Sequence, residues 1–172
     1  MANRQYDLIV IGSGPAGEKG AAQAAYFAKK VAMVESDSHL GGAAAATTIP
    51  SKTLRETALA LSGMKARRLH GVDLSLRRQS TVQDLMYHES TVKESERGRV
   101  EINMLRHNVD VLKGRASFVD KRTIKVEAPG KMPDFIEADV VLIATGSSPR
   151  RPDNFPIWDH IYDSDSILSI KS

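Results

Sequence analysis

The sequence predicts an α/β fold of the Rossmann type, with a parallel sheet, flanking helices and a small antiparallel β-ribbon. Leu8–Ile11 is a short apolar run, typical of a strand buried on both faces, and glycines follow it at G-x-G-x-x-G spacing. An alanine-rich stretch with good helix formers then leads to a second apolar run, Val31–Val34, which ends in the acid Glu35. A strand, a glycine turn, a helix, a second strand and a terminal acid together form the context that a dinucleotide-binding unit requires.

The glycines of this motif have separate predicted roles. Gly12 allows the tight turn, Gly14 lets the backbone approach a pyrophosphate, and Gly17 lets the next helix lie close to the strand. The helix begins near Pro15 and Ala16, so its N–H groups and the positive end of its dipole are directed at the phosphates. The motif therefore predicts a phosphate site at the start of this helix.

Glu35 is the predicted partner of a ribose. It stands at about the distance expected for an acid that accepts hydrogen bonds from a ribose diol. Its negative charge also disfavours a 2′-phosphate at the same place. The alternative for the whole motif is a glycine-rich turn in an ordinary α/β domain.

The composition narrows the class of protein. The 172 residues carry a net charge of only +3, and the arginine pairs at 67–68, 77–78 and 150–151 are separate, so we expect no nucleic-acid partner. No apolar run approaches 18 residues and Met1–Gln5 is polar, so we expect no membrane span, no signal peptide and a cytoplasmic location. The chain has no cysteine, and its five histidines lack metal-ligand spacing, so no metal site is predicted.

We expect residues 1–149 to form one dinucleotide-binding domain with a flexible basic insertion at 63–79, and residues 150–172 to form a linker. A helix is expected whose first turn Pro50 can occupy and which continues through the good helix formers of Thr53–Ser62, and a long helix from a capping-box-like start at Thr81 to about His107. Further strands are expected at Val109–Leu112, Ala116–Val119, Thr123–Glu127, Phe135–Glu137 and Val140–Ala144.

Four landmarks in order carry a resemblance to a known family. They are Gly12–Gly17 with Glu35, Gly41-Gly42, Ile49–Lys52 and Ala144–Pro149. Together they resemble the FAD-binding region of the flavoprotein pyridine-nucleotide disulfide oxidoreductases. Within that family, the segments Thr48–Arg55 and Ile161–Leu168 resemble the members that transfer a hydride between NADPH and NAD.

The resemblance implies FAD as the cofactor, with NAD and NADP as substrates of the complete enzyme. It implies cofactor contacts from Gly12, Gly14, Gly17, Glu35, Ser36, Gly41, Gly42, Ala43, Thr145 and Gly146. It also implies a catalytic role for Lys52, as a cation near the flavin N5 edge that stabilises reduced flavin. The alternative for Lys52 is an ordinary lysine in the first turn of a helix, and for Thr145-Gly146 a plain turn at the end of a strand.

Two departures from the family modify this interpretation. Ala43–Thr48 stands where the disulfide-reducing members have their cysteine pair, so we predict no disulfide reductase activity. The chain also stops about where the nicotinamide-binding domain would begin, so we expect an N-terminal piece with weak FAD binding and no turnover by itself. An open sheet edge would then favour self-association. The alternatives are a non-catalytic dinucleotide-binding module and a truncated dihydrolipoamide dehydrogenase-like protein.

Overall fold

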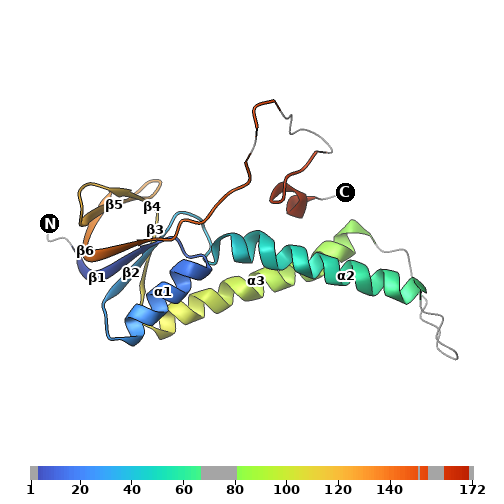
Figure 1. The fold of residues 1–172 in the computed structure, drawn as a ribbon, viewed down its shortest axis with the longest axis horizontal. Coiled ribbons are helices and arrows are strands. Elements are labelled where there is room, and N and C mark those ends of the chain that lie inside the picture. Colours follow the sequence, from blue (N-terminus) through green and yellow to red (C-terminus); the bar gives the residue numbers. More distant parts are fainter. Residues whose placement is uncertain (1–3, 67–80, 151, 155–160, 171–172) are drawn as a thin grey trace. The chain divides into compact units, whose positions relative to one another are not determined.

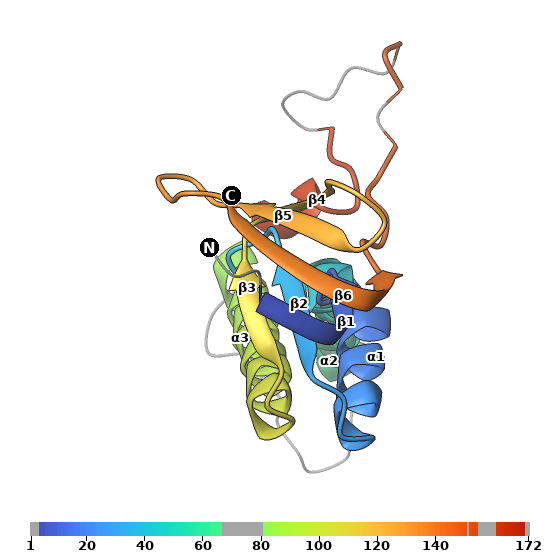
Figure 2. The ribbon, with the colours of Figure 1, turned by 90° about the vertical axis from the view of Figure 1, so that its left-hand side faces the viewer.

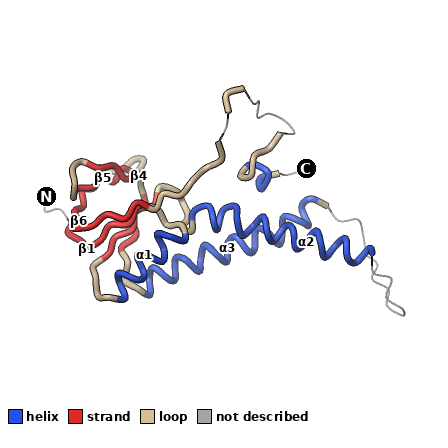
Figure 3. The backbone as a smooth tube through the Cα atoms, viewed as in Figure 1, coloured by secondary structure: helices blue, strands red, loops and turns tan. Residues whose placement is uncertain are grey.

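The computed structural model describes residues 4–66, 81–150, 152–154 and 161–170, and the chain divides into two units. The first unit contains residues 1–45 and 96–147, and the second contains residues 46–95 and 148–172. Figure 1 labels the elements and Figure 3 separates helices from strands. In order they are β1 (Arg4–Ile11), α1 (Pro15–Tyr26), β2 (Val31–Glu35), the π-helical turn η1 (Ala44–Thr48), α2 (Ile49–Ala66), α3 (Val82–Arg106), β3 (Asp110–Lys113), β4 (Arg115–Phe118), β5 (Thr123–Glu127), β6 (Asp134–Ile143) and the 3₁₀ turn η2 (Ser166–Ser169).

The strands form one sheet in the order β3-β2-β1-β6-β5-β4. Strand β1 pairs in parallel with both of its neighbours, so that Leu8 lies opposite Val31 on one side and Val140 on the other. Strand β3 pairs in parallel with β2, whereas β5 pairs antiparallel with both β6 and β4. The predicted fold class is therefore confirmed, and the predicted antiparallel ribbon is a continuation of the same sheet.

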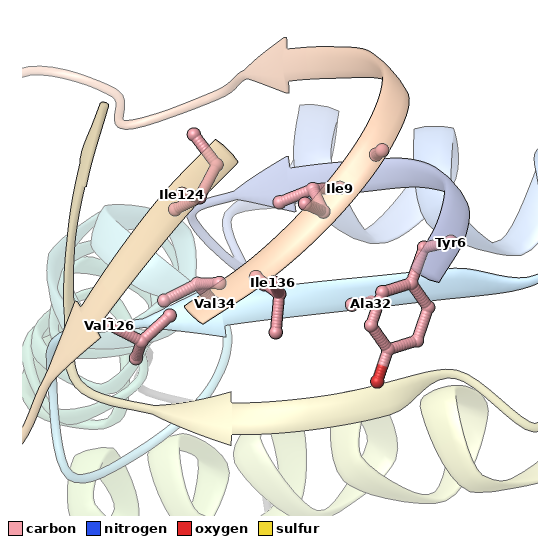
Figure 4. Close-up of a cluster of buried hydrophobic side chains, with 8 residues drawn as sticks. Tyr6, Ile9, Ala32, Val34, Ile124, Val126 and Ile136 are labelled. Carbon is pink, nitrogen blue, oxygen red and sulfur yellow. The ribbon is translucent and has the colours of Figure 1, made fainter. Parts of the chain in front are cut away.

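Each face of the sheet has its own hydrophobic core. Figure 2 shows α1 and the C-terminal part of α3 on one face, where Met33 packs in a cluster with Ala21 and Met104. On the other face, side chains of β5 and of the first part of β6 pack against side chains of β1 and β2, and Figure 4 shows this second cluster. Ile9 and Ile136 there are fully buried. The two clusters explain why β1 and β2 read as continuous apolar runs, because strands buried on both faces need no polar alternation.

Strand β6 corrects two of the predicted elements. The sequence predicts separate strands at Phe135–Glu137 and Val140–Ala144, but the chain runs through Ala138 without a turn as one ten-residue strand. The first part of β6 pairs with β5, and nearly its whole length pairs with β1. The apolar second part is also less buried than expected of such a strand, with Val140 57% and Ile143 64% exposed.

The helices follow the predicted signals closely. Pro50 lies in the first turn of α2, as predicted, but this helix continues to Ala66, through the first four residues of the predicted insertion. The rest of that insertion, with its arginine pairs, lies outside the described residues. At the start of α3, the Asp84 N–H donates to Thr81 Oγ1 (3.2 Å) and the Thr81 N–H donates to Asp84 Oδ2 (2.9 Å), which confirms the capping box. In the described part of the chain, no helix combines the length and apolarity needed to cross a membrane.

Candidate functional site

Three loops of the first unit converge where parallel strands end. They follow β1, β2 and β6, and comprise residues 12–14, 36–43 and 144–146. The Gly12 N–H donates to the Val34 carbonyl, and the Ala144 N–H donates to the Ile11 carbonyl, each at 2.8 Å. Because β1 lies between β2 and β6, this edge is the topological switch point at which open α/β sheets bind ligands.

The first and third glycines of the motif are required by backbone contacts within the protein. Gly12 has a φ of +102°, and a Cβ built on it would lie 2.4 Å from the Ala144 carbonyl oxygen. A Cβ built on Gly17 would lie 1.9 Å from the Gly12 carbonyl oxygen. The backbone of the turn after β1 therefore contacts the backbones of both α1 and the loop after β6. The sequence predicts the close approach of the turn and the helix, but not that of the loop.

Gly14 is different, because no protein atom demands a glycine there. A Cβ built on it would meet nothing within 4 Å, and its φ of −62° is open to any residue. Gly14 is the N-cap of α1 and supplies no side-chain hydrogen bond, and Pro15 opens the helix. The first turn of α1 therefore keeps N–H groups for an anion, and the space left by the missing side chain is where a pyrophosphate would lie.

The loop after β2 forms the second wall of this cradle. A Cβ built on Gly42 would lie 3.0 Å from the Gly14 Cα, so the two glycines bring the loops together. The Gly41 N–H donates to the hydroxyl of Ser13 (3.0 Å), which is fully buried. This contact fixes the loop to the turn that follows β1. By contrast, Ser36 and Ala43 are exposed in this loop.

Glu35 is only 7% exposed and is already held by hydrogen bonds. Its Oε2 accepts from the Ser13 N–H (2.9 Å) and Oγ (2.6 Å), and its Oε1 accepts from the Asp37 N–H (2.8 Å) and weakly from Ser36 Oγ (3.4 Å). Burial alone raises the pKa of this carboxyl, but these hydrogen bonds outweigh it, so the net pKa lies below its usual value. Glu35 is thus an ionised, oriented acceptor at the end of β2.

Sequence reasoning missed Ser13, which ties the turn after β1 to Glu35 and to the Gly41 N–H of the loop after β2. A hydroxyl between the first two glycines of the motif is a signal that could have found it, because that position is forced to lie beside the acid that ends β2. Thr145 and Gly146 are exposed at the end of β6, and a Cβ built on Gly146 would meet nothing within 4 Å. The third loop of the site, residues 144–146, therefore leaves this edge of the sheet open.

Lys52 lies in the second unit, in the first turn of α2, with an exposed side chain. Its predicted place beside a flavin stays a prediction. In the described part of the chain, no group of three or more His, Cys, Asp or Glu residues is arranged to hold a metal ion.

The fold and this edge define a dinucleotide-binding domain of the Rossmann type. Residues 6–168 match the family described as pyridine nucleotide-disulphide oxidoreductase, and the chain belongs to this family. The resemblance derived from the sequence is thereby confirmed.

Two sets of relatives support this assignment. The chain is 40% identical to the soluble pyridine nucleotide transhydrogenase of Mycobacterium tuberculosis (strain ATCC 25177 / H37Ra), over 98% of its own length and 37% of that relative. It is 39% identical to the protein of the same name from Colwellia psychrerythraea, over 96% and 36%. The structure of the HOCl-induced flavoprotein disulfide reductase RclA from Escherichia coli superposes with a TM-score of 0.79 at 23% identity, over 99% of this chain and 35% of RclA, and shows the same fold. The chain thus spans a little over a third of the length of these relatives.

Proposed function

We propose that this chain is the FAD-binding part of a flavoprotein that transfers hydride between NADPH and NAD. The observation that carries the proposal is the empty place at Gly14, bounded by the uncapped start of α1 and by Gly42, with the ionised Glu35 at the neighbouring strand end. Such a cradle has donors for a pyrophosphate and an acceptor for a ribose, the two kinds of group that a dinucleotide requires.

In this proposal the protein supplies binding and orientation, and FAD supplies the hydride chemistry when it is bound. The residues that would hold it are Gly12, Gly14, Pro15, Ala16 and Gly17 at the pyrophosphate, Glu35 at the ribose, Ser36, Gly41, Gly42 and Ala43 along the loop after β2, and Thr145 and Gly146 after β6. Lys52 would place a cation near the flavin. The names of the transhydrogenase relatives support NAD and NADP as substrates, and their sites would be provided by the part of the relatives' length that this chain does not span.

Titration of the purified chain with FAD and, separately, with NAD tests this function. We expect FAD to bind weakly, with a change in the flavin absorbance spectrum during the titration and with ADP as a competitor. Glu35→Gln should weaken FAD binding by about tenfold, because a neutral amide is a poorer acceptor for the ribose hydroxyls. Asp37→Asn, two residues further on in the exposed loop after β2, is the matched control and should leave the affinity within about twofold, since one exposed charge is screened.

A second candidate is a non-catalytic dinucleotide-binding module. The absence of cysteine from Ala43–Thr48 is compatible with it, but equally with hydride transfer, which needs no protein thiolate, so the bound cofactor distinguishes the two. NAD binding without FAD binding would support this module and refute the flavoprotein.

The sheet edge supports a further part of the proposal, self-association of the chain. The register between β5 and β6 runs from Asp134 to Glu137, whereas the more exposed Val140 and Ile143 lie beyond it. Unpaired strand edges with apolar side chains are templates for pairing with another chain. Light scattering on the purified chain should give a mass above 18.8 kDa, and a monomer at all concentrations would contradict this expectation.

The relatives' names describe soluble proteins, which supports the predicted cytoplasmic location.

A further inference from the structure

A buried carboxylate lies one helical turn from the proposed phosphate site. Glu18 is in the first turn of α1 and is only 2% exposed. Two residues of α3 hold it. Arg99 donates from Nη1 to Oε1 (2.9 Å) and from Nη2 to Oε2 (3.2 Å), and the Asn103 amide donates to Oε1 (2.7 Å). The guanidinium is oriented in turn by Glu96, whose Oε2 accepts from Nε at 2.9 Å.

This placement creates an electrostatic conflict. An acid in the first turn stabilises a helix by complementing its dipole, but it competes with any anion that the same helix end binds. Glu18 lies four positions after Gly14, which corresponds to about 6 Å along a helix axis. Charges that are buried are screened far less than exposed ones, so an unpaired Glu18 would repel a pyrophosphate at Gly14.

We propose that Arg99 is a positioning residue for dinucleotide binding, which acts by neutralising Glu18 and fixing the first turn of α1 against α3. The inference rests on the proposed function. The bidentate geometry is the arrangement in which a guanidinium holds a carboxylate with both charge and direction, so the N–H groups of the turn stay available to the ligand. Because Arg99 is half exposed, it reaches Glu18 without itself being buried, and its contact with Glu96 limits its rotamers.

Calorimetric titration with ADP, the phosphate-bearing half of the cofactor, tests the inference on the whole chain. Arg99→Met should weaken ADP binding about tenfold, since it leaves the buried Glu18 carboxylate with only the 3.4 Å contact to the exposed Lys19 Nζ as a compensating charge. Glu18→Gln should bind ADP at least as tightly as the unmodified chain while its melting temperature falls, because a stabilising ion pair is lost but a repulsive charge is removed. The double variant should recover to within about threefold of Glu18→Gln. Arg106→Met removes the same charge from an exposed position on α3 and should leave ADP affinity unchanged.

A purely structural clamp predicts the opposite pattern. In that case Glu18→Gln would weaken ADP binding in parallel with its loss of stability, and adding it to Arg99→Met would worsen the defect. Either result would overturn the inference. If Arg99→Met does not fold, Glu18→Gln decides the matter by the sign of its effect, and Arg99→Lys, which keeps the charge, should stay within about threefold of the unmodified chain. Failure of the unmodified chain to bind ADP would overturn the proposed function and the inference together, whereas a wrong pattern among the variants would overturn the inference alone.

Discussion

Replacement of Ser13 by alanine is the sharpest test of how the cradle is held together. The hydroxyl of Ser13 donates to Glu35 Oε2 at 2.6 Å and accepts from the Gly41 N–H at 3.0 Å, and the side chain is fully buried. Ser13→Ala therefore removes one hydrogen bond to a charged group and leaves one buried N–H without its acceptor. The backbone N–H of residue 13 still donates to Glu35.

The size of the effect follows from these two losses. A hydrogen bond to a charged group contributes about 1.5–3 kcal/mol, and an unsatisfied buried donor costs about 1–3 kcal/mol. Both hydrogen bonds involve the same atom, Ser13 Oγ, and the loop relaxes in part, so the two losses do not add fully. We therefore expect the free energy of unfolding to fall by about 2–4 kcal/mol. For a chain of this length that lowers the melting temperature by roughly 5–15 °C.

Urea unfolding followed by far-UV circular dichroism measures this change directly. Ser38→Ala is the matched control, since the Ser38 hydroxyl bonds only locally in the same exposed loop, and it should stay within about 0.5 kcal/mol of the unmodified chain. ADP affinity should fall as well for Ser13→Ala, because the loop after β2 loses its bond to the Ser13 hydroxyl and Glu35 keeps only the bond from the backbone N–H of residue 13. A stability change below about 0.5 kcal/mol for Ser13→Ala would refute the role assigned to its hydroxyl.

Three other predictions follow from the same geometry. Gly12→Ala should lower the free energy of unfolding by about 3 kcal/mol or more, because the new Cβ would lie 2.4 Å from the Ala144 carbonyl oxygen and the φ is +102°. Gly130→Ala, with a φ of +71° and open space around it, should lower it by only about 1–2 kcal/mol. Equal losses for the two variants in urea unfolding would contradict the close contact at Gly12. Glu18 and Glu35 have pKa values below their unfolded values, so their stabilisation is complete above about pH 4.5 and is lost as the pH falls through the folded pKa values. The unfolding free energy should accordingly drop as the pH falls below about 4.5, less steeply in Glu18→Gln, and a flat profile would contradict the stabilising role of the two ionised carboxylates. Finally, the chain should not reduce lipoamide or glutathione disulfide, because it contains no cysteine; measurable thiol production above a buffer control would refute this.

Much of the fold was accessible from the sequence because local signals and tertiary structure agree there. The apolar runs of β1 and β2 lie on both faces against hydrophobic clusters, and the Thr81–Asp84 pair caps α3 as its spacing predicts. The sequence did not reveal that β6 is one strand. Glu137, Asp139 and the small Ala138 interrupt its apolar pattern and resemble a break, yet the strand stays paired with β1 through these residues while its register with β5 ends at Glu137, and only the sheet topology shows this.

The candidate site divides in the same way. The glycines could be assigned from their spacing, because a backbone contact that leaves no room for a Cβ requires a glycine. The backbone contacts of Gly12 and Gly17 agree with their predicted packing roles. The clamp on Glu18 could not be assigned, since Arg99 lies 81 residues away and only the packing of α3 on the sheet brings the two together. Ion pairs between distant elements have no periodic signature in a single sequence.

The state of Glu35 leads to a last prediction, about how a ribose would share it. A carboxylate offers about four lone-pair sites, two on each oxygen. Both sites on Oε2 are taken by Ser13, while Oε1 accepts a short bond from the Asp37 N–H and a 3.4 Å bond from Ser36 Oγ, and the Ser36 backbone N–H also bonds to the carboxylate. The bond from Ser36 Oγ is the longest of those with a stated distance, so a ribose hydroxyl would bond to Oε1 and displace the Ser36 hydroxyl. Ser36→Ala, which keeps the backbone N–H, should leave ADP affinity unchanged or raise it by up to about threefold, in contrast to the loss expected for Ser13→Ala. Parallel titrations of the two variants check this, and a loss of affinity in Ser36→Ala as large as in Ser13→Ala would show that the ribose does not take the place of the Ser36 hydroxyl on Oε1.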